Sequence, residues 1–197
     1  MDDDSLYLER CQSGEAEAFG VLYDRYIDKI YRFVYYKTFS KETAEDITSQ
    51  VFHKALEKIN TYTESKGSFS SWLYRIARNS VIDHYRTSKD DLPLEDVFEV
   101  GFDERTPESL DAISALKTIR AYLETLDARQ REIIILRVWE EKSYKEIAEI
   151  IGGTEAGVKM AFSRGIRELR EKCGPVSPWL FMMACSLTAA LPFNDLS

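Results

Sequence analysis

Residues 143–169 constrain the fold more than any other part of this sequence. They begin with Ser143-Tyr-Lys-Glu, and a serine followed three residues later by a glutamate is typical of a capping box at the start of a helix. The Gly152-Gly153 pair then predicts a tight turn, after which Thr154 can cap a second helix. A helix of about eight residues, a glycine turn and a longer helix have the dimensions of a helix-turn-helix.

The apolar spacing predicts how these two helices pack. Ile147, Ala148 and Ile151 of the first helix are predicted to pack against Val158, Phe162 and Ile166 of the second. Ala148 is small, so it suits a point where the two backbones approach closely. A second stripe, which comprises Glu155, Lys159, Ser163 and Arg167, is predicted to face a DNA major groove, and Thr154 with the first amides of that helix can meet a phosphate. The alternative is a helical hairpin with a solvated charged face. Gly165 is expected to loosen the second helix by roughly 0.5–1 kcal/mol.

The rest of the chain also reads as helices, and nothing shows the alternation of strands. Residues 15–39 have apolar residues at helical spacing. Ser40 can cap a helix through Ile59, and a polar loop over residues 60–68 precedes a helix over residues 69–86. Thr106-Pro107 predicts the start of a helix to about Leu126, and Asp127 that of another to Trp139. The sequence therefore predicts an all-α protein.

The helix over residues 69–86 has a polar face and an apolar face. The apolar face comprises Leu73, Ile76, Ala77 and Val81, and the polar face comprises Arg75, Arg78, Asn79, Asp83 and Arg86. Arginines suit phosphates, whereas Asn and Asp can bond to base edges. The preceding loop mixes aromatic, basic and hydroxyl groups, as a pocket for an unstacked base requires; its members are Tyr62, Glu64, Lys66, Ser68 and Phe69. Trp72 is expected in the core. A solvated face with intrahelical ion pairs is the alternative for the arginine stripe.

The distribution of charge matters more than its sum, which is −8. Residues 1–24 contain seven acidic residues and one basic residue, and residues 90–111 contain nine acidic residues and one basic residue. Residues 25–89, in contrast, contain twelve basic and seven acidic residues. An acidic leader and an acidic middle segment thus account for the net charge, which does not exclude DNA binding.

No pattern in the sequence indicates catalysis. The two histidines, His53 and His84, fall on different predicted helices, and no phosphate loop or nucleophile elbow is present. The three cysteines are far apart and lack the spacing of a disulfide framework or a zinc site. We therefore expect a protein that is not an enzyme, with no cofactor and no metal. The cysteines and the acidic N-terminus, which is unlike a signal peptide, indicate the cytoplasm.

Two groups of motifs resemble one family. Residues 126–137 (LDARQREIIILR), the SYKEIAEIIG motif from Ser143 and the pairs Val158-Lys159 and Ser163-Arg164 resemble the C-terminal promoter-binding domain of extracytoplasmic-function sigma factors of the sigma-70 family. Residues 44–52 and the run FSSWLYRIARN from Phe69 resemble the first domain of the same family. The similarity covers about residues 10–172, and it implies two helical domains, 10–87 and 107–172, joined by an acidic linker, 88–106.

The resemblance implies a role in transcription initiation. The first domain would bind −10 promoter DNA as a melted strand through Lys66, Ser68, Phe69, Arg75, Arg78, Asn79, Asp83 and Arg86. The second would bind −35 DNA through the helix-turn-helix, with Thr154, Glu155, Lys159, Met160, Ser163, Arg164 and Arg167. The implied partner is core RNA polymerase, through the clamp helices of its largest subunit and the flap of the second largest. The polymerase-facing residues on the helix capped by Ser40 would be Glu45, Asp46, Ser49, Gln50 and His53.

Two points stay open at this stage. A helix-turn-helix regulator that never contacts polymerase is the alternative function. Residues 173–197 form an extension that lies outside the family pattern, and within it residues 179–191 are nearly uncharged but too short to span a bilayer. This extension could pack back on the chain, regulate the sigma domains, or recruit an anti-sigma factor or a membrane partner.

Overall fold

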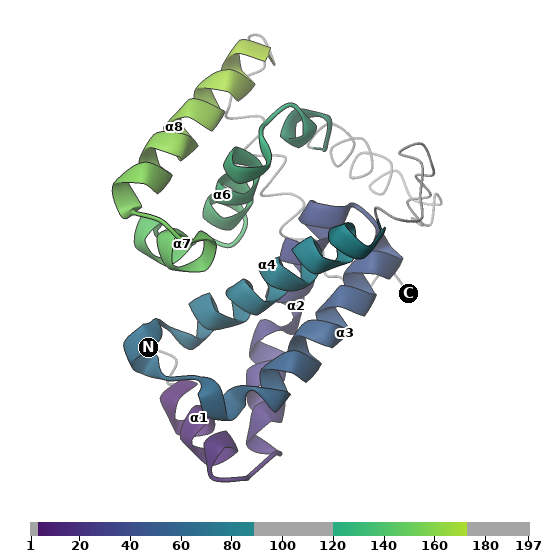
Figure 1. Cartoon of the computed structure of the whole chain (residues 1–197), viewed down its shortest axis with the longest axis vertical. Helices are drawn as coiled ribbons and strands as arrows, with labels where there is room; N and C mark the ends of the chain where they lie inside the picture. Colours follow the sequence, from purple (N-terminus) through teal and green to yellow (C-terminus); the bar gives the residue numbers. More distant parts are fainter. Residues whose placement is uncertain (1–3, 89–119, 173–197) are drawn as a thin grey trace, which may run out of the picture. The chain divides into compact units, whose positions relative to one another are not determined.

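The computed structural model describes residues 4–88 and 120–172, and within these ranges the ordered elements are all helices (Figure 1). The predicted all-α fold is confirmed. Residues 120–124 are also helical, whereas the predicted helix start at Thr106, the acidic linker and the C-terminal extension lie outside the described residues. The helices are α1 Asp4–Gln12, α2 Ala18–Thr38, α3 Lys41–Glu57, α4 Phe69–Ser88, α6 Ala128–Val138, α7 Tyr144–Ile151 and α8 Glu155–Lys172, with 3₁₀ turns η1 Ile59–Thr61 and η2 Glu64–Lys66.

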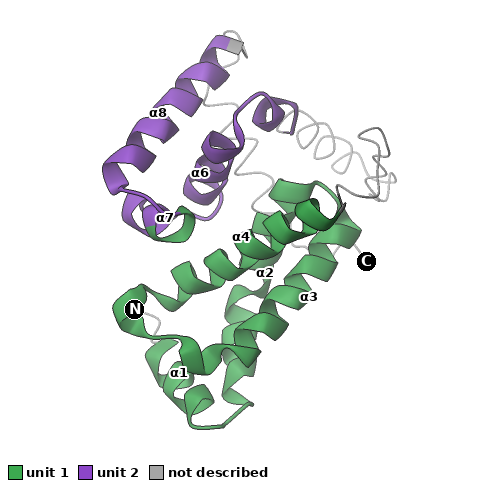
Figure 2. Cartoon of the chain, viewed as in Figure 1, with its two compact units in different colours: residues 1–98, 149–151 green, residues 99–148, 152–197 purple. Residues whose placement is uncertain are grey.

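The chain divides into two compact units (Figure 2). One unit comprises residues 1–98 with 149–151, and the other comprises residues 99–148 with 152–197. The first therefore contains α1 to α4. The second contains α6, α8 and the first part of α7.

Helices α2, α3 and α4 form the core of the first unit (Figure 1). A two-residue connection joins α2 to α3: Phe39 adopts a left-handed conformation, and the Ser40 side chain accepts a hydrogen bond from the Thr43 amide, as a helix cap does. An apolar stripe of α3 is buried at Ala44, Ile47, Val51 and Ala55, and Ile59 in the following η1 turn is buried as well. Leu22, Ile30 and Phe33 of α2 are fully buried as well.

Helix α4 buries most of the face that the sequence predicted. Leu73, Ala77 and Val81 are buried, whereas Ile76 is only half-buried. Tyr74, which the apolar spacing did not single out, is fully buried and makes an edge-to-face contact with the Phe33 ring, with 5.3 Å between the ring centroids. Aromatic packing of this kind adds to the stabilisation from area burial.

Helix α1 is an addition to the predicted fold. It lies on α2 through buried Leu8 and Cys11. At its first residue, the Asp4 carboxylate accepts a hydrogen bond from the Tyr26 hydroxyl (2.6 Å) and forms an ion pair with Arg25. The acidic leader is therefore not merely a solvated segment, because part of it is a docked helix.

Helix α6 is the buried element of the second unit. The four consecutive residues from Ile133 to Leu136 are all fully buried, so α6 is apolar on more than one face. Its start was predicted correctly: the Asp127 carboxylate accepts hydrogen bonds from the amides of Arg129 and Gln130, both at 2.8 Å, and Gln130 completes a capping box.

The helix-turn-helix has the predicted elements. The Ser143 hydroxyl accepts from the Glu146 amide, and the Glu146 carboxylate accepts from the Ser143 amide, so the capping box that opens α7 is present. Gly152 and Gly153 have φ angles of +75° and +147°, which side chains disfavour. The Thr154 hydroxyl accepts from the Gly157 amide (3.1 Å) and so caps α8.

The packing of α7 and α8 differs in part from the prediction. Ile147 and Val158 are fully buried as expected, but Ile150 is buried where Ile151, only half-buried, had been expected. Gly165 is also buried, and a Cβ atom there would lie 3.0 Å from the Ile134 Cδ1 atom. Gly165 therefore does more than lower helix propensity, since it lets α8 approach α6 closely.

Candidate nucleic-acid interface

The exposed stripe of α8 contains every residue that the sequence predicted to face duplex DNA. Thr154 and six residues of α8 are exposed: Glu155, Lys159, Met160, Ser163, Arg164 and Arg167. Met160, with 56% of its surface accessible, is among the most exposed apolar side chains described. Lys159, Ser163 and Arg167 are four residues apart and so lie along one side of the helix. This surface is basic, apart from Glu155 near its N-terminal end.

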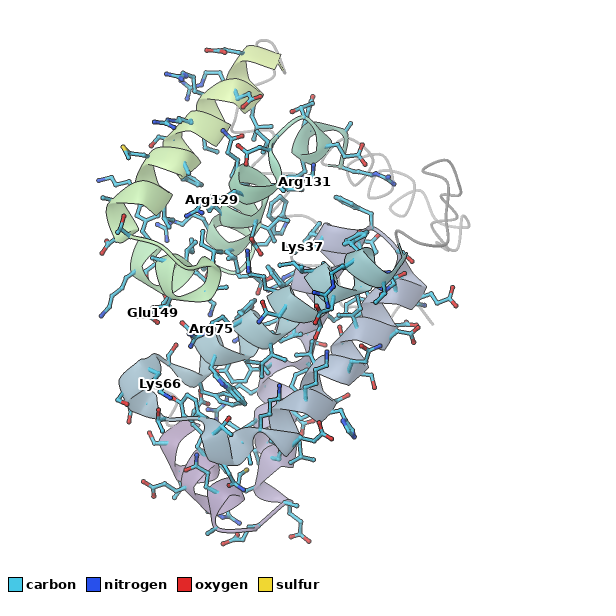
Figure 3. The ribbon with its side chains drawn as sticks, in the orientation of Figure 1. Lys37, Lys66, Arg75, Arg129, Arg131 and Glu149 are labelled. Carbon is cyan, nitrogen blue, oxygen red and sulfur yellow. The ribbon has the colours of Figure 1, made fainter. Side chains whose placement is uncertain are left out.

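Two arginines of α6 link this helix to other segments of the second unit; both are labelled in Figure 3. A guanidinium N–H of Arg129 donates to the Gly152 carbonyl (3.3 Å), which links the start of α6 to the glycine turn. Arg131 donates to the carbonyls of Leu123 and Leu126, at 2.9 and 3.3 Å, and so joins α6 to the chain before it. Sequence reasoning assigned neither role.

A third arginine supports the start of α7. The Arg137 guanidinium lies over the Tyr144 ring, 5.0 Å from its centroid, and also donates to the Lys142 carbonyl (2.9 Å). The Tyr144 ring in turn contacts Phe162 of α8, with 5.8 Å between centroids. This chain of contacts fixes α8 relative to α7, which a helix-turn-helix needs if it is to present a rigid surface.

The polar face of α4 is present but unevenly exposed. Asn79, Asp83 and Arg86 are exposed, whereas Arg75 and Arg78 are half-buried. The Arg86 and Asp83 side chains form an ion pair three residues apart at 3.4 Å, as the solvated-face alternative expects. Such an exposed pair contributes little to stability and can open to contact a phosphate.

Arg75 of α4 contacts the loop that precedes this helix. Its guanidinium donates to the Lys66 carbonyl (3.4 Å), so at least one of its N–H groups contacts the protein itself (Figure 3). Lys66 and Ser68 are exposed. The Ser68 hydroxyl accepts from the Ser71 amide (3.1 Å) and donates to the Ser71 hydroxyl (3.0 Å), which makes it the cap of α4.

Phe69, which the sequence predicted as a DNA contact, is buried and not exposed on the surface. Only 3% of Phe69 is exposed, because its ring packs against the rings of Tyr26, Tyr62 and Trp72 at centroid distances of 5.6, 5.7 and 5.6 Å. Burying a phenylalanine side chain is worth about 1.5–3 kcal/mol, which is similar to the roughly 1–3 kcal/mol of one stacked base, so moving the ring out to a base would bring no clear gain.

The other aromatic residues of this loop region also belong to the cluster. Tyr62, which the sequence placed in the base pocket, is 8% exposed, and Trp72 is half-buried at the edge of the cluster. Burial, followed by the nearby carboxylates of Glu64 and Asp4, raises the pKa of the Tyr62 hydroxyl. The aromatic content of the loop therefore serves packing more than exposure to a ligand.

The outward face of α3 forms a separate surface. The five residues predicted to face polymerase, Glu45, Asp46, Ser49, Gln50 and His53, are all exposed. Two of them take part in weak ion pairs along the helix: Lys41 with Glu45 at 3.9 Å, and His53 with Glu57 at 3.6 Å if the imidazole is protonated. Leu56, 43% exposed, extends this face by one turn with an apolar side chain that sequence reasoning did not include.

The surfaces lack features of a metal or membrane site within the described ranges. Among residues 4–88 and 120–172, no group of three or more His, Cys, Asp or Glu side chains is arranged to hold a metal ion. No helix in these ranges has the length and apolar character needed to cross a membrane.

Comparisons with known proteins identify the family. Residues 22–102 match Sigma-70 region 2, and residues 116–169 match Sigma-70, region 4. The ECF RNA polymerase sigma factor SigW of Bacillus subtilis is 32% identical over 178 residues, which cover 84% of this chain and 94% of SigW. BldN of Streptomyces coelicolor, also an ECF RNA polymerase sigma factor, is 39% identical over 166 residues, which cover 82% of this chain but only 62% of BldN.

A solved structure has the same fold. CnrH, in complex with the cytosolic domain of CnrY, superposes with a TM-score of 0.70 over 87% of this chain and 97% of CnrH, at 22% identity. Two helical units, an exposed basic face on α8 and the matched regions together define a class of helical transcription factor. The chain belongs to the extracytoplasmic-function sigma factors of the sigma-70 family.

Proposed function

We propose that this chain binds core RNA polymerase in the cytoplasm and directs transcription initiation at specific promoters. In this proposal α8 reads −35 DNA as duplex, while α4 and the preceding loop bind −10 DNA as a melted strand. The outward face of α3 contacts the clamp helices of the largest polymerase subunit, and the second unit contacts the flap of the second largest subunit. No step requires covalent chemistry by the chain.

The observation that carries the proposal is the exposed stripe of α8 on a rigid helix-turn-helix. Lys159, Ser163 and Arg167 are aligned and exposed, and the cap at Thr154 and the glycine turn fix the helix that presents them. The helix N-terminus adds a site for a phosphate. A generic hairpin would not need this combination of a fixed turn and an ordered basic face.

Within the first unit, the proposal assigns −10 contacts to Lys66, Ser68, Arg75, Arg78, Asn79, Asp83 and Arg86. The exposed members, above all Asn79, are suited to base edges, and half-buried Arg75 and Arg78 are suited to the backbone. Phe69 is excluded from the set because it is buried.

The experiment is run-off transcription with purified core polymerase, using the DNA upstream of the chain's own gene as template. The wild-type chain should produce a discrete transcript that core polymerase alone does not. Replacing Arg78 and Asn79 together with alanine should abolish it while leaving affinity for core polymerase unchanged. Replacing Asp46 with alanine should instead weaken core binding. Tight binding of a duplex operator by the chain alone, with no transcript, would establish the regulator that acts without polymerase.

Regulation by a second protein is part of the proposal, because CnrH, which shares the fold, is seen in complex with another protein. We expect an anti-sigma factor, or the chain's own residues 173–197, to inhibit initiation. Deleting residues 173–197 should then raise transcript yield in the same assay. Unchanged yield and unchanged aggregation would leave the extension without a regulatory role.

A further inference from the structure

The loop between α3 and α4 is held by a side chain of α1, a helix that is distant from the loop in sequence. Gln12, the last residue of α1, donates hydrogen bonds from its amide nitrogen to the carbonyls of Ile59 and Tyr62, both at 3.0 Å. These two carbonyls flank the η1 turn, 47 and 50 residues away in sequence. The Gln12 amide thus closes the start of the loop.

Two more loop carbonyls accept hydrogen bonds from side chains. The Tyr62 hydroxyl donates to the Gly67 carbonyl (3.3 Å), and Arg75 donates to that of Lys66 (3.4 Å). Backbone bonds add to this order, since the amides of Tyr62, Lys66 and Gly67 donate to earlier loop carbonyls at 3.0–3.1 Å. A connection of this length would ordinarily leave such groups to water.

We propose that Gln12 is a positioning residue that preorganises the loop over residues 59–68 for capture of an unstacked base of −10 DNA. This inference rests on the function proposed above. Fixing a loop in advance removes part of the conformational entropy that binding would otherwise cost. Lys66 lies in the ordered segment, so its side chain is presented from a fixed backbone.

The chemistry of the side chain matters to this role. A primary amide carries two N–H donors on one nitrogen and can serve two carbonyls, whereas a carboxylate has no donor and would repel both. Helix α1 is also fixed at its other end, where Asp4 accepts from Tyr26. Gln12 therefore acts from an anchored helix rather than from a free terminus, although its sequence position is far from the loop.

The first test measures loop order without DNA, using the full chain and its Gln12→Met variant. Methionine keeps the length of the side chain but removes both donors. We expect hydrogen exchange at the amides of Tyr62, Lys66 and Gly67 to become about tenfold faster, the effect of losing one to two net hydrogen bonds. Glu9→Met, at an exposed position of α1, is the matched control and should leave exchange unchanged. Unchanged exchange in Gln12→Met would overturn the positioning role.

The second test measures capture, using holoenzyme and a fork-junction DNA whose −10 element is single-stranded. Gln12→Met should weaken fork binding about tenfold, while affinity for core polymerase and for a −35 duplex stays at the wild-type value. Faster exchange with undiminished fork binding would overturn the role in base capture. If wild-type holoenzyme itself does not bind the fork, the proposed function fails, and the exchange result still decides whether Gln12 orders the loop.

A second variant keeps the inference testable if Gln12→Met does not fold. Tyr62→Phe removes the hydroxyl that donates to Gly67 but retains the ring in the aromatic cluster. It should increase exchange at the Gly67 end of the loop and weaken fork binding in the same direction. Wild-type exchange together with wild-type fork binding in this variant would contradict the preorganised loop.

Discussion

Glu146 shows how one local hydrogen-bonding pair fixes the start of α7. Burial raises the pKa of its carboxyl, but hydrogen bonds from the Ser143 hydroxyl (2.7 Å) and amide (2.8 Å), with the charges of Lys142 and Arg137, outweigh burial and lower the pKa overall. A carboxyl whose pKa is lowered on folding stabilises the protein above its unfolded pKa of about 4.3. That stabilisation is lost as the pH falls through the folded pKa.

Replacing Ser143 with alanine should therefore have two coupled effects. The pKa of Glu146 should rise towards its ordinary value, and the free energy of unfolding at pH 7 should fall by about 1 kcal/mol, because the cap is lost. Part of this difference should disappear as the pH falls through the lowered pKa of Glu146 in the wild-type protein. NMR titration of the carboxyl and denaturant unfolding at pH 7 and pH 3 measure both quantities. A pKa that is the same in both proteins would refute the coupling.

Gly165 is the subject of a second prediction about a single residue. Because a Cβ there would lie 3.0 Å from the buried Ile134 side chain, Gly165→Leu should lower the free energy of unfolding by about 1–3 kcal/mol through overpacking. Gly20 is the control, because it is also a helical glycine but a Cβ there would have nothing within 4 Å. Gly20→Ala should raise the free energy of unfolding by about 0.5–1 kcal/mol. Hydrogen exchange of the α8 amides would measure the effect of Gly165→Leu, and that of the α2 amides the effect of Gly20→Ala. Slower exchange in α8 of Gly165→Leu would contradict the predicted destabilisation.

At the scale of elements, the docking of α1 depends on the Tyr26 hydroxyl. Burial, then the hydrogen bond to Asp4, raises the pKa of this hydroxyl strongly. A raised pKa means that the neutral tyrosine stabilises the fold below its unfolded pKa of about 10, and that this contribution is lost only as the pH rises through the folded value.

Tyr26→Phe tests this contact without disturbing the ring, which packs on Phe69. The variant should be less stable by about 1 kcal/mol at neutral pH, and the deficit should shrink only above pH 10. Denaturant unfolding between pH 7 and pH 11 measures this difference in stability. Hydrogen exchange of the α1 amides shows whether α1 stays docked. Equal stability of the two proteins at pH 7 would show that the Tyr26–Asp4 hydrogen bond adds nothing to the docking of α1.

The elements predicted best from sequence are those with both a cap and a periodic face. Ser40, Asp127, Ser143 and Thr154 each mark a helix start that the structure confirms, because capping is a local property of a few residues. Helix α1 was missed because it is short, and its contacts, Asp4 to Tyr26 and Gln12 to the η1 turn, are distant in sequence. The burial of Phe69 was not predicted for the same reason, since its partner Tyr26 comes from another helix.

At the scale of the whole molecule, the net charge of −8 and the basic surface of α8 make opposing demands on DNA binding. Charges separated by more than about 8 Å are largely screened at physiological salt, so the local surface should decide the affinity for duplex DNA. Each cation that neutralises a phosphate releases counterions and steepens the salt dependence of binding. The distribution of charge, rather than its sum, should therefore set this dependence.

Replacing Arg164 and Arg167 together with alanine tests this conclusion. For holoenzyme on a −35 duplex, the slope of log K against log salt should become shallower by about 1.8, or 0.9 for each lost phosphate contact. Core affinity should not change. Arg10→Ala is the control: Arg10 lies exposed on α1, pairs with Glu15 and also carries one positive charge, so its loss changes the net charge without touching α8. Equal slopes in the double variant and the wild type would remove α8 from the phosphate-contacting surface, whereas a shallower slope in Arg10→Ala would show that net charge governs binding.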